Sequence, residues 1–142
     1  MRTDTSPISI LLPRPAPVLP EQPLLLYAIR RMGAHGLNDA HAANAMLSTF
    51  GQSYRRPLIL LRAFLAETAR ASKLKITIAA SCCGRMTRDE IILIDTLIMA
   101  VSDPHAEHQL LATCLGTVDC VGAFTSAQAL NQAFGDLARP LA

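Results

Sequence analysis

Apolar residues recur at helical spacing in nearly every long segment of this chain after residue 20. Steps of three or four residues between them are typical of amphipathic helices. Only residues 75–80, KITIAA, alternate as a strand would, with Ile76 and Ile78 two residues apart. One strand cannot form a sheet alone. The sequence therefore predicts an all-α fold: an irregular bundle of about six helices, with at most one short strand-like segment at 75–80.

Local signals predict where these helices begin and end. Thr87 is followed three residues later by Glu90, and Thr125 by Gln128, the pattern of a capping box in which two residues satisfy each other's free amides. Asn38 is a further expected N-cap. The predicted helices cover residues 21–34, Asn38 to Gly51, 57–72, the segment after Thr87, residues 104–115 after Asp103, and 126–138.

Two of these helices carry specific packing expectations. Residues 57–72 are apolar on nearly every side, which predicts a central helix buried all round. The helix after Asn38 is expected to bury the face formed by Ala40, Ala43, Met46, Leu47 and Phe50. Arg30 and Arg31 lie near the C-terminal end of the first predicted helix. We interpret them as compensating the helix dipole at that end.

The domain organisation follows from the prolines. Residues 1–20 hold five of the nine prolines, which predicts an extended, polyproline-like leader, and residues 21–142 form a single helical domain. Residues 8–12 could form a short added strand, which would end at Pro13. A lone strand at 75–80 would need an edge either from the leader or from a second copy of the chain.

Composition narrows the functional classes. Half of the residues (51%) are hydrophobic and only 17% are charged, which favours self-association through apolar surface. A net charge of +2 is too small to imply a nucleic-acid partner. No apolar run approaches the ~20 residues of a membrane span, and no signal peptide is evident. We expect a cytoplasmic protein with reduced thiols.

The main candidate for chemistry is the loop around Cys82 and Cys83. Arg85, Arg88 and the N-terminus of the next helix could each lower the pKa of a nearby thiol and so make it reactive. Cys82 and Arg88 also fit C-x5-R, which resembles the phosphate-binding loop of cysteine phosphatases. Those enzymes need a central sheet, so we favour a packing role, with one cysteine in the core and its neighbour facing a crevice.

Metal binding and nucleic-acid binding are weaker candidates. Zinc ligands usually come in close pairs such as C-x2-C, and no such pair occurs here. A mixed site would draw on Cys83, Cys120, His105 or His108, but no spacing supports it, and we expect no metal and no cofactor. The turn before the third helix, GQSYRR, could belong to a helix-turn-helix, but its second helix is too apolar to lie in a groove of DNA.

Four segments carry a resemblance to a known family: RRMGAHGLNDAHAANAML, RRPLILLRAFLAE, CCGRMT and DCVGAFTSAQAL. Together they are similar to a family of short, uncharacterised bacterial proteins classed as a domain of unknown function. The resemblance covers about residues 21–142. It implies one independent folding unit and no particular activity.

Taken together, the sequence favours a small cytoplasmic helical protein that is not an enzyme and acts through binding, as a homodimer or with a protein partner. The first alternative is a thiol- or metal-dependent protein centred on Cys82 and Cys83. The second alternative is an accessory regulator that binds nucleic acid.

Overall fold

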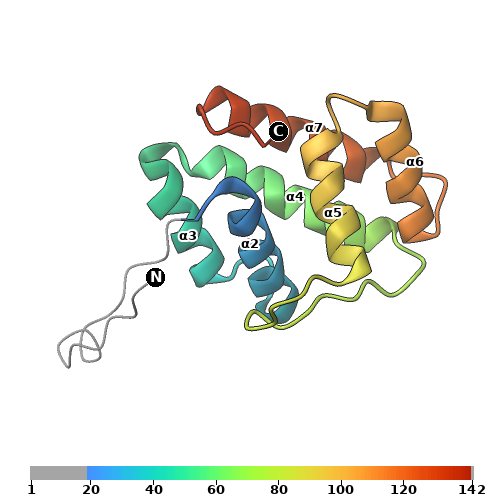
Figure 1. Ribbon diagram of the computed structural model, residues 1–142, viewed down its shortest axis with the longest axis horizontal. Coiled ribbons are helices and arrows are strands. Elements are labelled where there is room, and N and C mark those ends of the chain that lie inside the picture. The colour runs from blue at the N-terminus through green and yellow to red at the C-terminus, as the bar shows by residue number, and fades with distance from the viewer. Residues whose placement is uncertain (1–18, 142) are drawn as a thin grey trace.

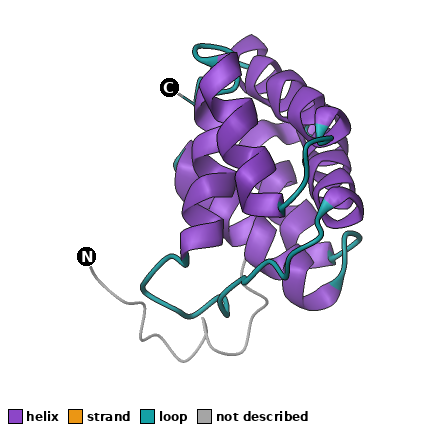
Figure 2. Ribbon diagram, turned by 90° about the vertical axis from the view of Figure 1, so that its right-hand side faces the viewer, coloured by secondary structure: helices purple, strands orange, loops and turns teal. Residues whose placement is uncertain are grey.

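The computed structural model describes residues 19–141, and every structural statement below concerns this part of the chain. It contains helices and no strand (Figures 1 and 2). The predicted all-α bundle is confirmed, whereas the leader at 1–20 lies almost wholly outside the described residues. The elements are α2 (Glu21–His35), α3 (Ala40–Phe50), the 3-10 helix η1 (Gly51–Ser53), α4 (Arg55–Ala71), α5 (Arg88–Met99), α6 (Pro104–Leu115) and α7 (Val121–Asp136).

Helix α4 crosses the middle of the bundle and packs most extensively against α7 (Figure 1). Phe64 of α4 and Phe134 of α7 are fully buried. The ring of Phe50, at the end of α3, meets Phe134 edge to face, with 5.0 Å between the ring centroids. Burial of Phe64 and Phe134 contributes roughly 1.5–3 kcal/mol each, and the contact with Phe50 joins α3 and α7 in one core.

The expectation that the third helix is buried all round is wrong. Helix α4 begins at Arg55, and Ile59 on its outer side is 58% exposed. Its buried residues form one stripe, namely Pro57, Leu58, Leu61, Phe64 and Thr68. Because folded proteins expose much apolar surface, an apolar sequence on every side of a helix did not require burial on every side.

Helix α3 begins one residue later than expected. Asp39, not Asn38, is the N-cap, and its Oδ2 accepts a hydrogen bond from the backbone N of Ala42 at 2.9 Å. The expected buried face is also rotated: Leu47 is 44% exposed, whereas the buried residues are Ala42, Ala45, Met46 and Thr49. The small alanine side chains face the bundle because they let α3 pack closely against α2.

The predicted start of the last helix, at residue 126, is also wrong. The helix begins at Val121, with Cys120 as N-cap, so Thr125 lies inside it. The hydroxyl of Thr125 donates to the backbone oxygen of Val121 at 2.8 Å, a bond that a threonine makes within a helix and not at its start. The second predicted capping box is therefore wrong, whereas the expected end of α6 at Gly116, with φ of 66°, is confirmed.

The connection between α4 and α5 reaches the C-terminal end of α2 before it turns back to α5 (Figure 1). Its side chains Ile76 and Ile78 are half-buried. Ile78 lies against Gly33 of α2, where an added Cβ would come within 3.3 Å of Ile78 Cγ2. Residues 75–80 thus run close to α2 but belong to no sheet in the described part. No helix between residues 19 and 141 is long and apolar enough to span a membrane.

Candidate functional site

One edge of residues 75–80 is bound to the first turn of α5. The backbone N of Thr77 donates to Asp89 Oδ2 at 2.8 Å, and the backbone N of Ala79 donates to Glu90 Oε2 at 3.1 Å. The backbone oxygen of Thr77 accepts from the hydroxyl of Thr87 at 2.7 Å. Side chains of α5 therefore occupy the place that a neighbouring strand would have in a sheet.

Thr87 and Glu90 also form the predicted capping box at the start of α5. The hydroxyl of Thr87 accepts from the backbone N of Glu90 at 3.0 Å, and Glu90 Oε1 accepts from the backbone N of Thr87 at 2.8 Å. This prediction is confirmed. Glu90 thus caps its own helix and also binds the backbone of the incoming connection.

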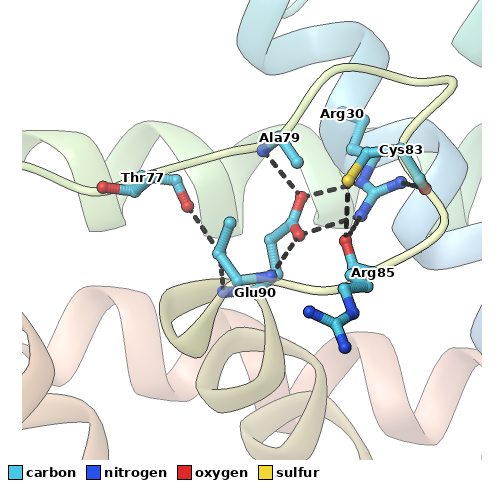
Figure 3. A network of polar contacts seen from close by, with 7 residues as sticks. Arg30, Thr77, Ala79, Cys83, Arg85 and Glu90 are labelled. Carbon is cyan, nitrogen blue, oxygen red and sulfur yellow. Dashed lines mark hydrogen bonds and ion pairs between the residues drawn. The ribbon is translucent and has the colours of Figure 1, made fainter.

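Glu90 forms a buried ion pair with Arg30 of α2 (Figure 3). Arg30 Nε donates to Glu90 Oε2 at 2.8 Å, and Nη2 donates to Oε1 at 3.0 Å; the two side chains are 4% and 0% exposed. Burial by itself would raise the pKa of Glu90, but the hydrogen bonds from Arg30, Thr87 and Ala79 outweigh it and lower that pKa. The hydrogen bond to Glu90 also raises the pKa of Arg30, against the opposing effect of burial. Both groups are therefore charged in the folded protein.

Arg30 also holds the loop that carries the two cysteines. Its Nη1 donates to the backbone oxygen of Cys83 and its Nη2 to that of Arg85, each at 2.7 Å (Figure 3). We call Arg30, Glu90 and the main-chain groups that they bind between Ala79 and Thr87 the clasp. Each oxygen of Glu90 accepts two hydrogen bonds within the clasp, and Arg30 uses four N–H donors there.

The predicted site residues lie on the outside of the clasp. Cys82 and Cys83 are both exposed, so the expectation that one of them is a core residue is wrong. Cys83 Sγ donates to the backbone oxygen of Arg85 at 3.2 Å. The side chains of Arg85 and Arg88 are exposed and form no hydrogen bond or ion pair with any residue from 19 to 141. The cysteines are exposed because Arg30 holds the loop by its carbonyl groups and leaves its side chains toward water.

The loop geometry differs from a phosphate-binding loop. Backbone amides converge on the anion in such a loop, whereas here the backbone oxygens of Cys83 and Arg85 converge on the guanidinium of Arg30. The described part of the chain also has no sheet beneath the loop. The arrangement therefore binds a cation, and that cation is already part of the protein.

The metal candidates separate into three places. Cys120 Sγ lies 3.7 Å from His108 Nε2. Cys83 belongs to the cysteine loop that the clasp holds. His105 Nε2 lies 3.4 Å from Gln109 Nε2. Within residues 19–141, no three His, Cys, Asp or Glu side chains gather closely enough to hold a metal ion. Burial, together with the charge of Asp119, raises the pKa of Cys120, which keeps this thiol protonated.

A wide hollow lies where the segment after α4 meets the turn between α6 and α7. It measures about 700 Å³ and is lined by Lys73, His108, Gln109, Ala112, Thr113, Gly116, Thr117 and Val118. The backbone N of Lys73 donates to the oxygen of Leu115 at 2.8 Å and so joins the two segments. Three apolar side chains on these segments and at the first residue of α7 are exposed, and we call them the corner patch: Leu74, Val118 and Val121.

The arginines of the helix-turn-helix interpretation stand at the start of α4. Arg55 and Arg56 are both exposed. Arg56 Nη1 pairs with Asp136 Oδ2 of α7 at 2.9 Å. One of the two arginines is thus engaged within the protein.

The comparisons with known proteins bear on the chain as a whole. A family model described as a family of unknown function, DUF6628, matches residues 4–139. The chain belongs to this family. The matched range begins at residue 4, so it includes most of the proline-rich segment that the resemblance from sequence left out. No curated protein and no solved structure matches the chain.

Sequence reasoning missed Arg30 as a member of this site. Arg30 and Arg31 are adjacent near the end of the same helix, but Arg31 pairs locally with Asp39 at 3.1 Å, whereas Arg30 binds a residue 60 positions away. The capping box did identify Glu90. No local pattern identified its partner, because the pairing depends on how α2 and α5 meet in space.

Proposed function

We propose that this protein is a non-enzymatic binding protein that acts as a homodimer, and that two copies meet through the corner patch. The observation that carries the proposal is the exposure of this patch: Val118 is 94%, Val121 57% and Leu74 56% exposed. Exposed apolar side chains beside a hollow are typical of surfaces that bind another protein. The hollow of about 700 Å³ offers the concave part of such a surface.

The clasp supports a role without catalysis. A general acid, general base or anion-binding group must be free to meet a substrate. Both oxygens of Glu90 are occupied by backbone and Arg30 donors, and Arg30 is bound to Glu90 and to two carbonyl groups. The buried charges of the clasp therefore stabilise a loop shape and do not face a reactant.

The test is the oligomeric state in solution. Size-exclusion chromatography with light scattering should give twice the chain mass of 15.3 kDa at micromolar concentration. Val118→Glu should shift the protein to the monomer, because it places a charge in the apolar contact. Ile59→Glu is the matched control, since Ile59 is also exposed but lies on α4, near its other end. A monomeric wild-type protein, or equal effects of the two substitutions, would contradict the proposal.

A second candidate is a thiol-dependent function of Cys82 and Cys83, favoured by the exposure of both thiols on a firmly held loop. Iodoacetamide labelling at pH 7, followed by peptide mass spectrometry, should modify these two cysteines well before Cys114 and Cys120. Burial, with a smaller effect of Asp89, raises the pKa of Cys114 to about 11, which makes it a slow internal reference. Labelling of Cys82 and Cys83 no faster than that of free cysteine, with no metal in the purified protein, would remove this candidate.

A further inference from the structure

At Ile76 and Ile78, the second edge of residues 75–80 has no hydrogen-bond partner among residues 19–141. Thr77 and Ala79 direct their backbone groups to α5, as described above. The backbone N–H and C=O groups of Ile76 and Ile78 make no hydrogen bond to any residue between 19 and 141. In an extended chain, the backbone groups of alternate residues point to opposite edges. Ile76 and Ile78 therefore present, on the side away from α5, a strand edge with no partner in the described part of the chain.

An open edge of this kind is a template for another strand. Its side chains are already suited to a buried position, because Ile76 and Ile78 are half-buried over an apolar hollow of about 270 Å³ between α2 and α4. Other walls of the hollow include Met32 and Leu65. An added strand would extend this apolar cover and satisfy the free backbone groups at the same time.

We propose that residues 8–12 of the same chain, ISILL, add a strand to this edge. These residues lie outside the described part of the structure. Residues 8, 10 and 12 are Ile8, Ile10 and Leu12, which places three apolar side chains on one face of an extended segment. Pro7 and Pro13 bracket the segment, and since proline lacks a backbone N–H, they limit the strand to these five residues.

The length of the connecting chain fits this position. The described chain starts at Leu19 and enters α2 at Glu21. From Glu21 to Gly33, which contacts Ile78, the helix rises about 18 Å at 1.5 Å per residue. Residues 13–18, PRPAPV, span about 19 Å at 3.1 Å per residue in a polyproline conformation. A leader that runs back along α2 therefore brings residues 8–12 to the level of the open edge.

The test is amide hydrogen exchange, measured by NMR at residues 76–79 of the full-length protein. Thr77 and Ala79 are internal references, because α5 binds their amides whether or not a strand is added. We expect Ile76 and Ile78 to exchange at least about 10-fold more slowly in the wild type than in the Ile10→Pro variant, with no change at the two references. Ile10→Ala is the matched control, since it keeps the backbone N–H and should keep most of the protection.

Replacement of residues 8–12 by a Gly-Ser segment of equal length gives a second variant, and the helix signal in far-ultraviolet circular dichroism checks that each variant is folded. Fast exchange at Ile76 and Ile78 in the wild type would overturn the proposal. Equal protection in the wild type and in Ile10→Pro would overturn it too. Protection that survives Ile10→Pro but falls on dilution would assign the edge to a second copy instead. Val118→Glu should not change the exchange at Ile76 and Ile78, so a failure of the proposed dimer remains distinguishable.

Discussion

Arg30 of α2 and Glu90 of α5 are 60 residues apart in sequence, and they face each other as a bidentate ion pair in the interior of the protein. Each charge has further partners, because each oxygen of Glu90 also accepts a backbone N–H, and Arg30 also donates to two backbone carbonyls, all in the connection from α4 to α5. A break in this pair should therefore affect both the stability of the bundle and the path of the loop.

Arg30→Met should destabilise the protein strongly. The substitution keeps the length of the side chain but leaves Glu90 buried without its counter-charge, a loss that typically costs about 3–5 kcal/mol. The free energy of unfolding, measured with urea, tests this. Arg31→Met is the control, and we expect a much smaller loss because Arg31 binds Asp39 nearer the surface. Similar losses for the two variants would show that the clasp does not hold the bundle together.

Thr87→Ala should cost about 1–2 kcal/mol of unfolding free energy, because the capping hydroxyl of α5 is lost. The same change removes the hydrogen bond to the backbone oxygen of Thr77. Thr125→Ala should change stability by no more than about 0.5 kcal/mol, since that hydroxyl is exposed within α7 and alanine favours helices. Thermal or urea unfolding of both variants compares a true cap with a sequence that only resembles one.

These two threonines also show what the sequence could and could not predict. Both carry the same local pattern, and only Thr87 caps a helix. The signal fails at Thr125 because α7 continues one turn further back, to Val121, with no side chain that caps its first turn. The spacing of apolar residues along the chain predicts that a helix forms and that the fold is all-α, because this spacing is a local property of the sequence. Helix ends and faces depend on the neighbouring helices, and this explains the errors at α3, α4 and α7.

The candidate site was predictable only in part, for the same reason. The loop with Cys82 and Cys83 was identified from unusual local composition, and Glu90 from its capping pattern. The charge that organises them, Arg30, comes from another helix. The expectation that one cysteine is buried failed because Arg30, and not a thiol, fills the space beneath the loop.

Glu107 should make stability fall as the pH rises. Burial, then the nearby carboxylates of Asp95 and Asp103, raises its pKa from the ordinary 4.5 to about 7. Between these two values the folded protein binds more protons than the unfolded chain, so the stabilisation is complete below pH 4.5 and is lost as the pH rises through 7. We expect a loss on the order of 1–3 kcal/mol across this range.

Glu107→Gln should remove most of this pH dependence, because the neutral amide needs no proton. Urea unfolding of both proteins at pH 5 and pH 8 measures the effect. The variant should be the more stable protein at pH 8, and a wild-type protein that is no less stable than the variant at pH 8 would contradict the assignment to Glu107.

Gly116→Ala should destabilise the end of α6 and disturb the corner patch. Gly116 has φ of 66°, and a Cβ there would lie 2.7 Å from Leu74 Cγ. The left-handed conformation alone costs about 1–2 kcal/mol for alanine. Gly135→Ala is the opposite case, since nothing lies within 4 Å of the new Cβ on α7, and it should stabilise by about 0.5–1 kcal/mol. Melting temperatures should therefore move in opposite directions.

The way Arg30 grips the cysteine loop has a practical meaning for protein engineering. Its guanidinium holds the peptide carbonyls of residues 83 and 85, which every amino acid supplies, so this grip does not depend on which side chains stand there. Cys83 adds one side-chain bond, from its thiol to the carbonyl of Arg85, so Cys82, Gly84 and Arg85 are the positions to vary when new short peptides are displayed on this scaffold with Arg30 and Glu90 kept.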